Sequence, residues 1–145
     1  MFEKLFLLVK NNAKSSVIEN PLIPQKYHEP IINDATSTII EVLKGQMETG
    51  KMNDLVSFFQ LSGIYNNSLV KTIVNKCANK LNKFYSLDTA SALTVANSLI
   101  PPVMLELVKQ SKNKQNKEFS LGNFLSKLNG NKADLSNLLN RMTVA

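Results

Sequence analysis

With 145 residues the chain can bury one core, and its single cysteine and single histidine exclude an internal disulfide and a cysteine-rich zinc site. The hydrophobic share of 43% is close to the globular average, and five Gly and five Pro are too few to indicate a disordered chain. The net charge of +6 lies in the second half, because residues 67–145 hold eleven basic and four acidic side chains whereas residues 1–66 hold six and seven.

The first predicted helix begins at Phe2 and ends near Asn11, since apolar residues dominate this stretch. Residues 15–25 follow, and they contain Pro21 and Pro24, which favour extended geometry in the residues before them. We expect this stretch to be a connector whose apolar side chains lie against the core. These are Val17, Ile18, Leu22 and Ile23.

A second helix is predicted from Pro30, which suits a first helical turn, to Gly50, which is placed to end it. A short third helix is expected over residues 53–59, with the turn LSGIYNNS after it. A fourth helix is predicted from Ser68 to Tyr85, because its apolar and polar residues separate into two arcs at 100° per residue. The apolar arc consists of Val70, Ile73, Val74, Cys77, Ala78, Leu81, Phe84 and Tyr85.

Asp88 is placed to cap a fifth helix of small and apolar residues. Pro101 and Pro102 should break or sharply kink this helix, because each proline removes a backbone donor and crowds the preceding turn. Two short helices are expected over residues 120–128 and 134–142, and no strand pattern occurs. The sequence therefore predicts one all-α domain over residues 1–145, a multihelical array of about seven or eight helices.

An internal duplication is a second expectation about the fold. At an offset of 65, residues 5–13 fall on 70–78 and residues 39–44 fall on 104–109, with similar apolar spacing. Chance similarity between amphipathic helices is the alternative. The two pseudo-repeats would span residues 5–63 and 70–130.

No residue pattern typical of catalysis occurs. A nucleophile would have to use His28, which sits at a helix start where a capping or surface role is expected. Cys77 lies on an apolar arc and is expected to be buried and unreactive. Asp34 and Glu41 share a helix face, but this spacing is common on solvated helices. We therefore predict a protein with no enzymatic activity, no metal and no cofactor.

Two surfaces are candidates for binding. Lysines of the second half could contact nucleic acid phosphates without reading sequence, although a solvated lysine face in a Lys- and Asn-rich chain is the favoured interpretation. Apolar residues around the third helix could serve self-association or a protein partner, or could join the two halves. The lysines are Lys76, Lys80, Lys83, Lys109, Lys112, Lys114 and Lys117, and the apolar residues are Phe58, Phe59, Ile64 and Tyr65.

The segment FYSLDTASALTVANSLIPPVMLELV, from Phe84 to Val108, resembles a bacterial family of unknown function typified by YidB, and the later SLGNFLSKL fits the same family. The resemblance covers roughly residues 67–130. It implies a multihelical fold and supplies no activity, cofactor or site residue.

The apolar run from Leu5 to Val9 is too short for a signal peptide, and no apolar stretch reaches the roughly 20 residues that span a bilayer. We therefore expect a cytoplasmic protein that is not integral to a membrane. Its expected role is structural or in protein interaction. Weak nucleic-acid binding, which does not depend on sequence, is the alternative.

Overall fold

The computed structural model describes residues 2–48 and 67–112, and all regular secondary structure in these two stretches is helical. This confirms the all-α class. The short helices expected over 53–59, 120–128 and 134–142, and the helix end expected at Gly50, lie outside the described residues. The helices are α1 (Phe2–Asn11), the π-helical turn η1 (Lys14–Ile18), the 3-10 turn η2 (Gln25–Tyr27), α2 (His28–Glu48), α4 (Ser68–Phe84) and α5 (Thr89–Lys112).

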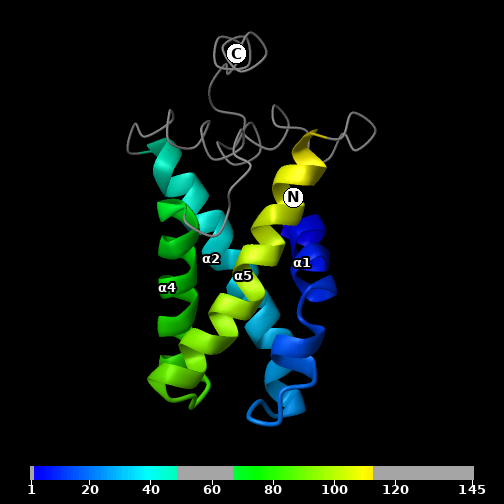
Figure 1. Ribbon diagram of the computed structural model, residues 1–145, viewed down its shortest axis with the longest axis vertical. Coiled ribbons are helices and arrows are strands. Elements are labelled where there is room, and N and C mark those ends of the chain that lie inside the picture. Colours follow the sequence, from blue (N-terminus) through cyan, green and yellow to red (C-terminus); the bar gives the residue numbers. More distant parts are fainter. Residues whose placement is uncertain (1, 49–66, 113–145) are drawn as a thin grey trace, which may run out of the picture.

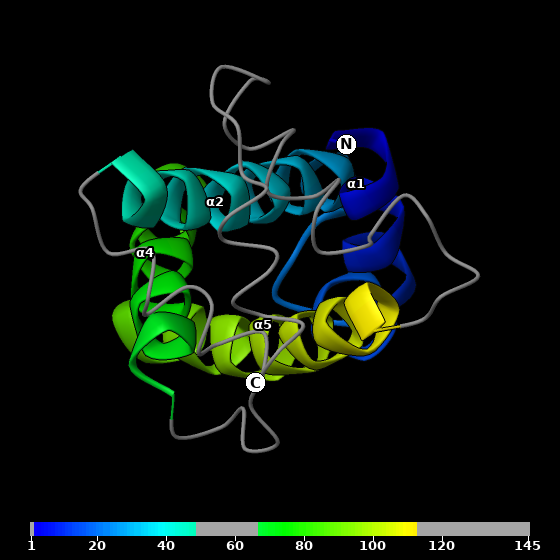
Figure 2. The same ribbon diagram turned by 90° about the horizontal axis from the view of Figure 1, so that it is seen from above.

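Within the described residues, four α-helices form the sides of a square when seen from above, in the order α1, α2, α4 and α5 (Figure 2). Each helix packs against the next, and α5 closes the ring by packing against α1. In the side view, α2 and α5 cross between α4 and α1 (Figure 1). One apolar core lies inside this ring. Its largest fully buried side chains are Leu5, Ile31, Ile39, Leu43, Ile73, Leu81 and Leu99.

Helix α4 has the boundaries and the buried arc that its sequence predicts. It begins after Asn67, whose side-chain oxygen accepts hydrogen bonds from the backbone N–H groups of Leu69 (2.8 Å) and Val70 (3.3 Å). The arc is buried from Val70 to Leu81, but Phe84 at the last turn is exposed. Phe84 therefore does not belong to the core. It is the last residue of α4, where the helix ends and the turn toward α5 begins.

The turn between α4 and α5 contains a left-handed residue. Ser86 has a φ of 58°, which costs an L-amino acid energy that glycine does not pay. The side-chain nitrogen of Asn82 donates to the carbonyl of Leu87 (2.8 Å), and a carboxylate oxygen of Asp88 accepts from the N–H of Ser91 (3.2 Å). These bonds hold the turn, and the second confirms Asp88 as the cap of α5.

Ser86→Gly should raise the free energy of unfolding by about 0.5–1 kcal/mol, because glycine adopts a positive φ without strain. Ser98→Gly is the matched control on an exposed turn of α5, where glycine should lower stability by about 0.5 kcal/mol. Urea denaturation of both variants measures the two effects. A loss of stability in Ser86→Gly would contradict the expectation.

Helix α5 continues through its two prolines, so of the two outcomes that the sequence predicts, a break or a sharp kink, the break does not occur. It runs from Thr89 to Lys112 with Pro101 and Pro102 inside it. The prolines leave the carbonyls of Asn97 and Ser98 without helical donors, but both residues are exposed, where water can bind these groups. The residues around the prolines are fully buried and hold the helix in place. These are Leu99, Ile100, Val103 and Met104.

The connector between α1 and α2 differs from the expectation in two ways. Its first part is a π-helical turn rather than extended chain, with the N–H of Ile18 donating to the carbonyl of Ala13 (3.1 Å). Val17 and Ile23 are buried as expected, but Ile18 and Leu22 are exposed. Because the segment runs along the outside of the bundle, only some of its side chains can reach the core.

Candidate interaction surface

The two carboxylates that share a face of α2 contact α4 and Tyr85, the residue that follows it. Asp34 accepts a hydrogen bond from the phenol of Tyr85, and Glu41 forms an ion pair with Lys80, with 3.5 Å between Oε2 and Nζ. The ring of Tyr27 packs edge-on against Tyr85, with 5.3 Å between centroids. Each carboxylate thus has its own partner, and together they hold α4 against α2 rather than forming an acid–base pair.

The two weak acids along this contact are held protonated. Burial raises the pKa of the Cys77 thiol to about 12, against a partial lowering by Lys80. Burial also raises the pKa of the Tyr85 phenol, and its hydrogen bond to Asp34 raises it further. A thiol that stays protonated at physiological pH is a poor nucleophile. Cys77 is therefore a core residue, as its position on the apolar arc predicts.

Removing the bond between Tyr85 and Asp34 should reveal its contribution to stability. We expect Tyr85→Phe and Asp34→Ala each to lower the free energy of unfolding, with a coupling of about 1 kcal/mol in a double-mutant cycle, because each change alone leaves the other half-buried group without its partner. Urea denaturation of the four proteins measures the coupling. Simple additivity would show that this bond contributes nothing.

His28 closes a short loop at the start of α2. Its Nε2 lies 3.2 Å from the carbonyl oxygen of Ile23, which can only accept, so Nε2 carries the proton and donates. The sequence predicts a capping or surface role for His28, whereas the structure places it half-buried in this loop contact. Among residues 2–48 and 67–112, no three metal-ligating side chains come together.

The structure separates the lysines that the sequence groups as a nucleic-acid surface. On α4, Lys76 and Lys83 are exposed, whereas Lys80 is half-buried against Glu41. Lys109 lies near the end of α5, which is the opposite end of the bundle from the end of α4 (Figure 1). The side chain of Lys112 lies outside the described residues, as do Lys114 and Lys117.

The apolar surface proposed from the sequence, formed by Phe58, Phe59, Ile64 and Tyr65, lies outside the described residues. Within the described part, exposed large apolar side chains occur elsewhere. They are Phe2, Leu7, Ile18, Leu22, Phe84 and Leu93.

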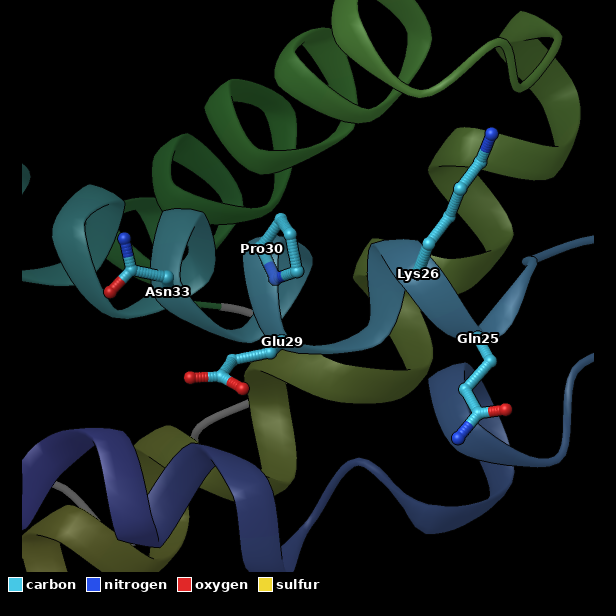
Figure 3. A pocket seen from close by; sticks show the side chains of 5 residues that line it. All are labelled: Gln25, Lys26, Glu29, Pro30 and Asn33. Atoms are coloured by element: carbon cyan, nitrogen blue, oxygen red, sulfur yellow. The ribbon is translucent and has the colours of Figure 1, made fainter.

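An open hollow lies where η2 meets α2. Figure 3 shows its side chains pointing apart: Glu29 extends toward α1, whereas Lys26 points away from it. Polar groups that diverge in this way do not form a pocket for a small ligand. Two further hollows continue from here along α1, and both include Phe6 and Glu29.

The outward face of α1 carries the best-defined apolar surface, which we call the α1 strip. Leu7 is 52% exposed and Phe2 is 38% exposed, while Phe6 is half-buried. The rings of Phe2 and Phe6 stack with 6.3 Å between centroids. Glu3 and Lys10 are both exposed on the same face. The α1 strip is defined as Phe2, Glu3, Phe6, Leu7 and Lys10.

The sequence predicts a first helix that contains Phe2 and Phe6, but it does not separate these residues from those that face the core. At 100° per residue, the buried residues Leu5, Leu8 and Val9 occupy one arc, and Leu7 falls well outside it. A helix that is apolar nearly all round is a signal that could have indicated a second contact surface.

No protein-family model matches the chain, and no curated protein or solved structure is significantly similar to it. Any functional conclusion therefore depends on the geometry of the described helices.

One described helix, from Thr89 to Ser111, is long and apolar enough to cross a membrane by length and composition. More than half of that stretch is buried inside the bundle, and the core helix of a globular protein passes the same test. The length and composition of this helix therefore do not distinguish a membrane-spanning helix from the core helix of a globular protein.

Proposed function

We propose that this protein is a non-enzymatic interaction module that binds another protein chain through the α1 strip. The supporting observation is that Leu7 and Phe2 are exposed beside the half-buried Phe6 on one helix face. Contiguous apolar surface of this kind marks sites of protein association. The ionisable groups between α2 and α4 hold these helices together. Protein binding through the α1 strip is therefore the function that the described surface supports best.

A comparison of the two halves supports the α1 strip as a binding surface. At the offset of 65, the inward residues of α1 and α4 correspond and are buried in both helices, as with Leu8 and Ile73. The outward residues differ, because Phe6 and Leu7 correspond to Lys71 and Thr72, and the latter two are exposed and polar. A helix in this position therefore does not need outward apolar residues to pack, and those of α1 call for another explanation.

A photo-crosslinking residue can test whether another chain lies on the α1 strip. With p-benzoylphenylalanine at Leu7, irradiation of the cells that produce the protein should give a specific covalent adduct of higher mass. The same residue at Thr72, the corresponding exposed position of α4, is the control and should give none. If Leu7 yields no more adduct than Thr72, the proposed function is wrong.

We also propose that the fold consists of two pseudo-repeats within an array of seven or eight helices, in keeping with the YidB-like resemblance. The ring order supports a two-fold relation, since exchanging α1 with α4 and α2 with α5 returns the same set of neighbours (Figure 2). Backbone chemical shifts should then indicate helices over both 53–59 and 120–128. A helix in only one of these segments would contradict the repeats.

Weak nucleic-acid binding is a second proposal, and one observation favours it. Helix α4 carries four lysines and no carboxylate, and Lys71, Lys76 and Lys83 are exposed. Fluorescence anisotropy should then show binding to labelled duplex that weakens steeply with salt. Replacing Lys76 and Lys83 with Gln, while keeping Lys80 for its ion pair with Glu41, should weaken binding further. No binding at low salt would exclude this function.

A further inference from the structure

We infer that the chain bound at the α1 strip is a second copy of this protein, with α1 packed against α1 in antiparallel orientation. This inference rests on the proposed function and adds the identity and orientation of the partner. It follows from the placement of two opposite charges within the strip.

Glu3 and Lys10 lie on one line along α1. They are seven residues apart, so they differ by only about 20° around the helix and by about 10 Å along it. Both are exposed, and neither forms an ion pair with another residue of the described chain. The apolar side chains flank this line, with Phe2 and Phe6 on one side and Leu7 on the other.

This arrangement is complementary to itself. When two copies of α1 meet about a two-fold axis that passes between Phe6 and Leu7, Glu3 of each copy faces Lys10 of the other. The same symmetry brings Phe6 of one copy against Phe6 of its partner on one side of this line, and Leu7 against Leu7 on the other. A parallel arrangement would instead place Glu3 against Glu3 and Lys10 against Lys10, and like charges facing each other are unfavourable.

Helix dipoles favour the same orientation. In an antiparallel pair the positive N-terminal end of each helix lies beside the negative C-terminal end of its neighbour, while Glu3 in the first turn and Lys10 in the last turn each offset the dipole of their own helix. A partner helix with only basic side chains would face a like charge at Lys10. A partner helix with only acidic side chains would face a like charge at Glu3. A second copy avoids that repulsion at both ends.

The association should be weak and reversible. A ten-residue helix is only about 15 Å long, and the α1 strip contributes few exposed apolar side chains from each copy. Small interfaces of this kind lie at the low end of the size range, so we expect a dissociation constant of roughly 10–100 µM.

Sedimentation velocity over a range of protein concentrations tests the inference with a charge swap. The full-length wild-type protein should shift from monomer to dimer as its concentration rises. Glu3→Lys and Lys10→Glu should each weaken dimerisation about tenfold, because each places like charges together at both ends of the contact. The double variant with both changes should recover to within about threefold of wild type, because opposite charges face each other again.

Two control variants test whether dimerisation depends on the α1 strip and not on another surface of the protein. Leu7→Lys should abolish the dimer, whereas Lys4→Glu changes charge on another line of α1 and should leave it unchanged. Reversing Glu3 and Lys10 also opposes the helix dipole, so circular dichroism must show that α1 keeps its helical content. If either single variant unfolds α1, the comparison of Leu7→Lys with Lys4→Glu decides the outcome.

Three results would overturn the inference. They are a wild-type protein that stays monomeric at several hundred micromolar, a dimer that ignores Leu7→Lys, and a charge-swapped double variant no stronger than the single variants. None of these removes the proposed function by itself. An adduct at Leu7 with a different protein would preserve that function while excluding the second copy as the partner.

Discussion

Leu99→Ala should lower the free energy of unfolding by about 3–5 kcal/mol, the largest effect of a single substitution that we expect in this protein. Leu99 is 0% exposed and lies in α5 immediately before the two prolines. Its removal leaves a cavity beside Ile100, Val103 and Met104, which are also fully buried and cannot close around it without moving the helix. The same residues surround a stretch of α5 that lacks two backbone donors and still remains helical.

Leu93→Ala is the matched control, since it makes the same chemical change on the same helix. Leu93 is 40% exposed, so less surface leaves contact with the core and the loss should be about 1 kcal/mol or less. Thermal or urea unfolding of both variants measures the difference. Similar losses in the two variants would show that Leu99 is not part of a close-packed core.

Stability should fall as the pH rises above 9, because the buried thiol of Cys77 resists ionisation. The unfolded chain loses this proton near pH 9, whereas the folded chain keeps it until about pH 12. Between these values the folded state binds one more proton than the unfolded state, so the free energy of unfolding falls by about 1.4 kcal/mol for each pH unit. The contribution of Cys77 is complete below pH 9 and lost as pH passes 12.

Cys77→Ala separates this effect from other alkaline transitions. The variant should show a shallower loss of stability from pH 9 upward, although it is somewhat less stable at neutral pH because the sulfur no longer fills its place in the core. The Tyr85 phenol, whose pKa is also raised, begins to contribute only above pH 10. Equal slopes in wild type and Cys77→Ala between pH 9 and 10 would contradict the burial of a protonated thiol.

Helix α4 shows how much of the fold local pattern can predict. Its two arcs repeat at the helical period over 17 residues, and the core covers the apolar arc from Val70 to Leu81. The prolines at 101 and 102 predict a break or a sharp kink, and the break does not occur because local preference competes with packing. Burial on both sides of the prolines outweighs two lost hydrogen bonds whose free carbonyls lie on exposed residues.

The candidate site was less predictable than the fold. Lys80 and Lys76 look equivalent on the helical wheel, yet only Lys80 meets Glu41, a residue 39 positions earlier in the chain. The sequence does not predict the α1 strip either. An apolar residue on a short helix is predicted to be buried unless the positions of the neighbouring helices are known. Both outcomes depend on contacts between residues far apart in sequence.

The sequence by itself determined the all-helical class, the boundaries of α4, the cap at Asp88 and the core position of Cys77, since each of these follows from the period and chemistry of neighbouring residues. Only the tertiary structure decided which apolar residues face solvent, which charges pair and whether α5 continues past its prolines. A helix in this ring has two neighbours, and these cover only part of its circumference. The side of α1 that they leave uncovered is set by the arrangement of all four helices, and that side carries Phe2 and Leu7.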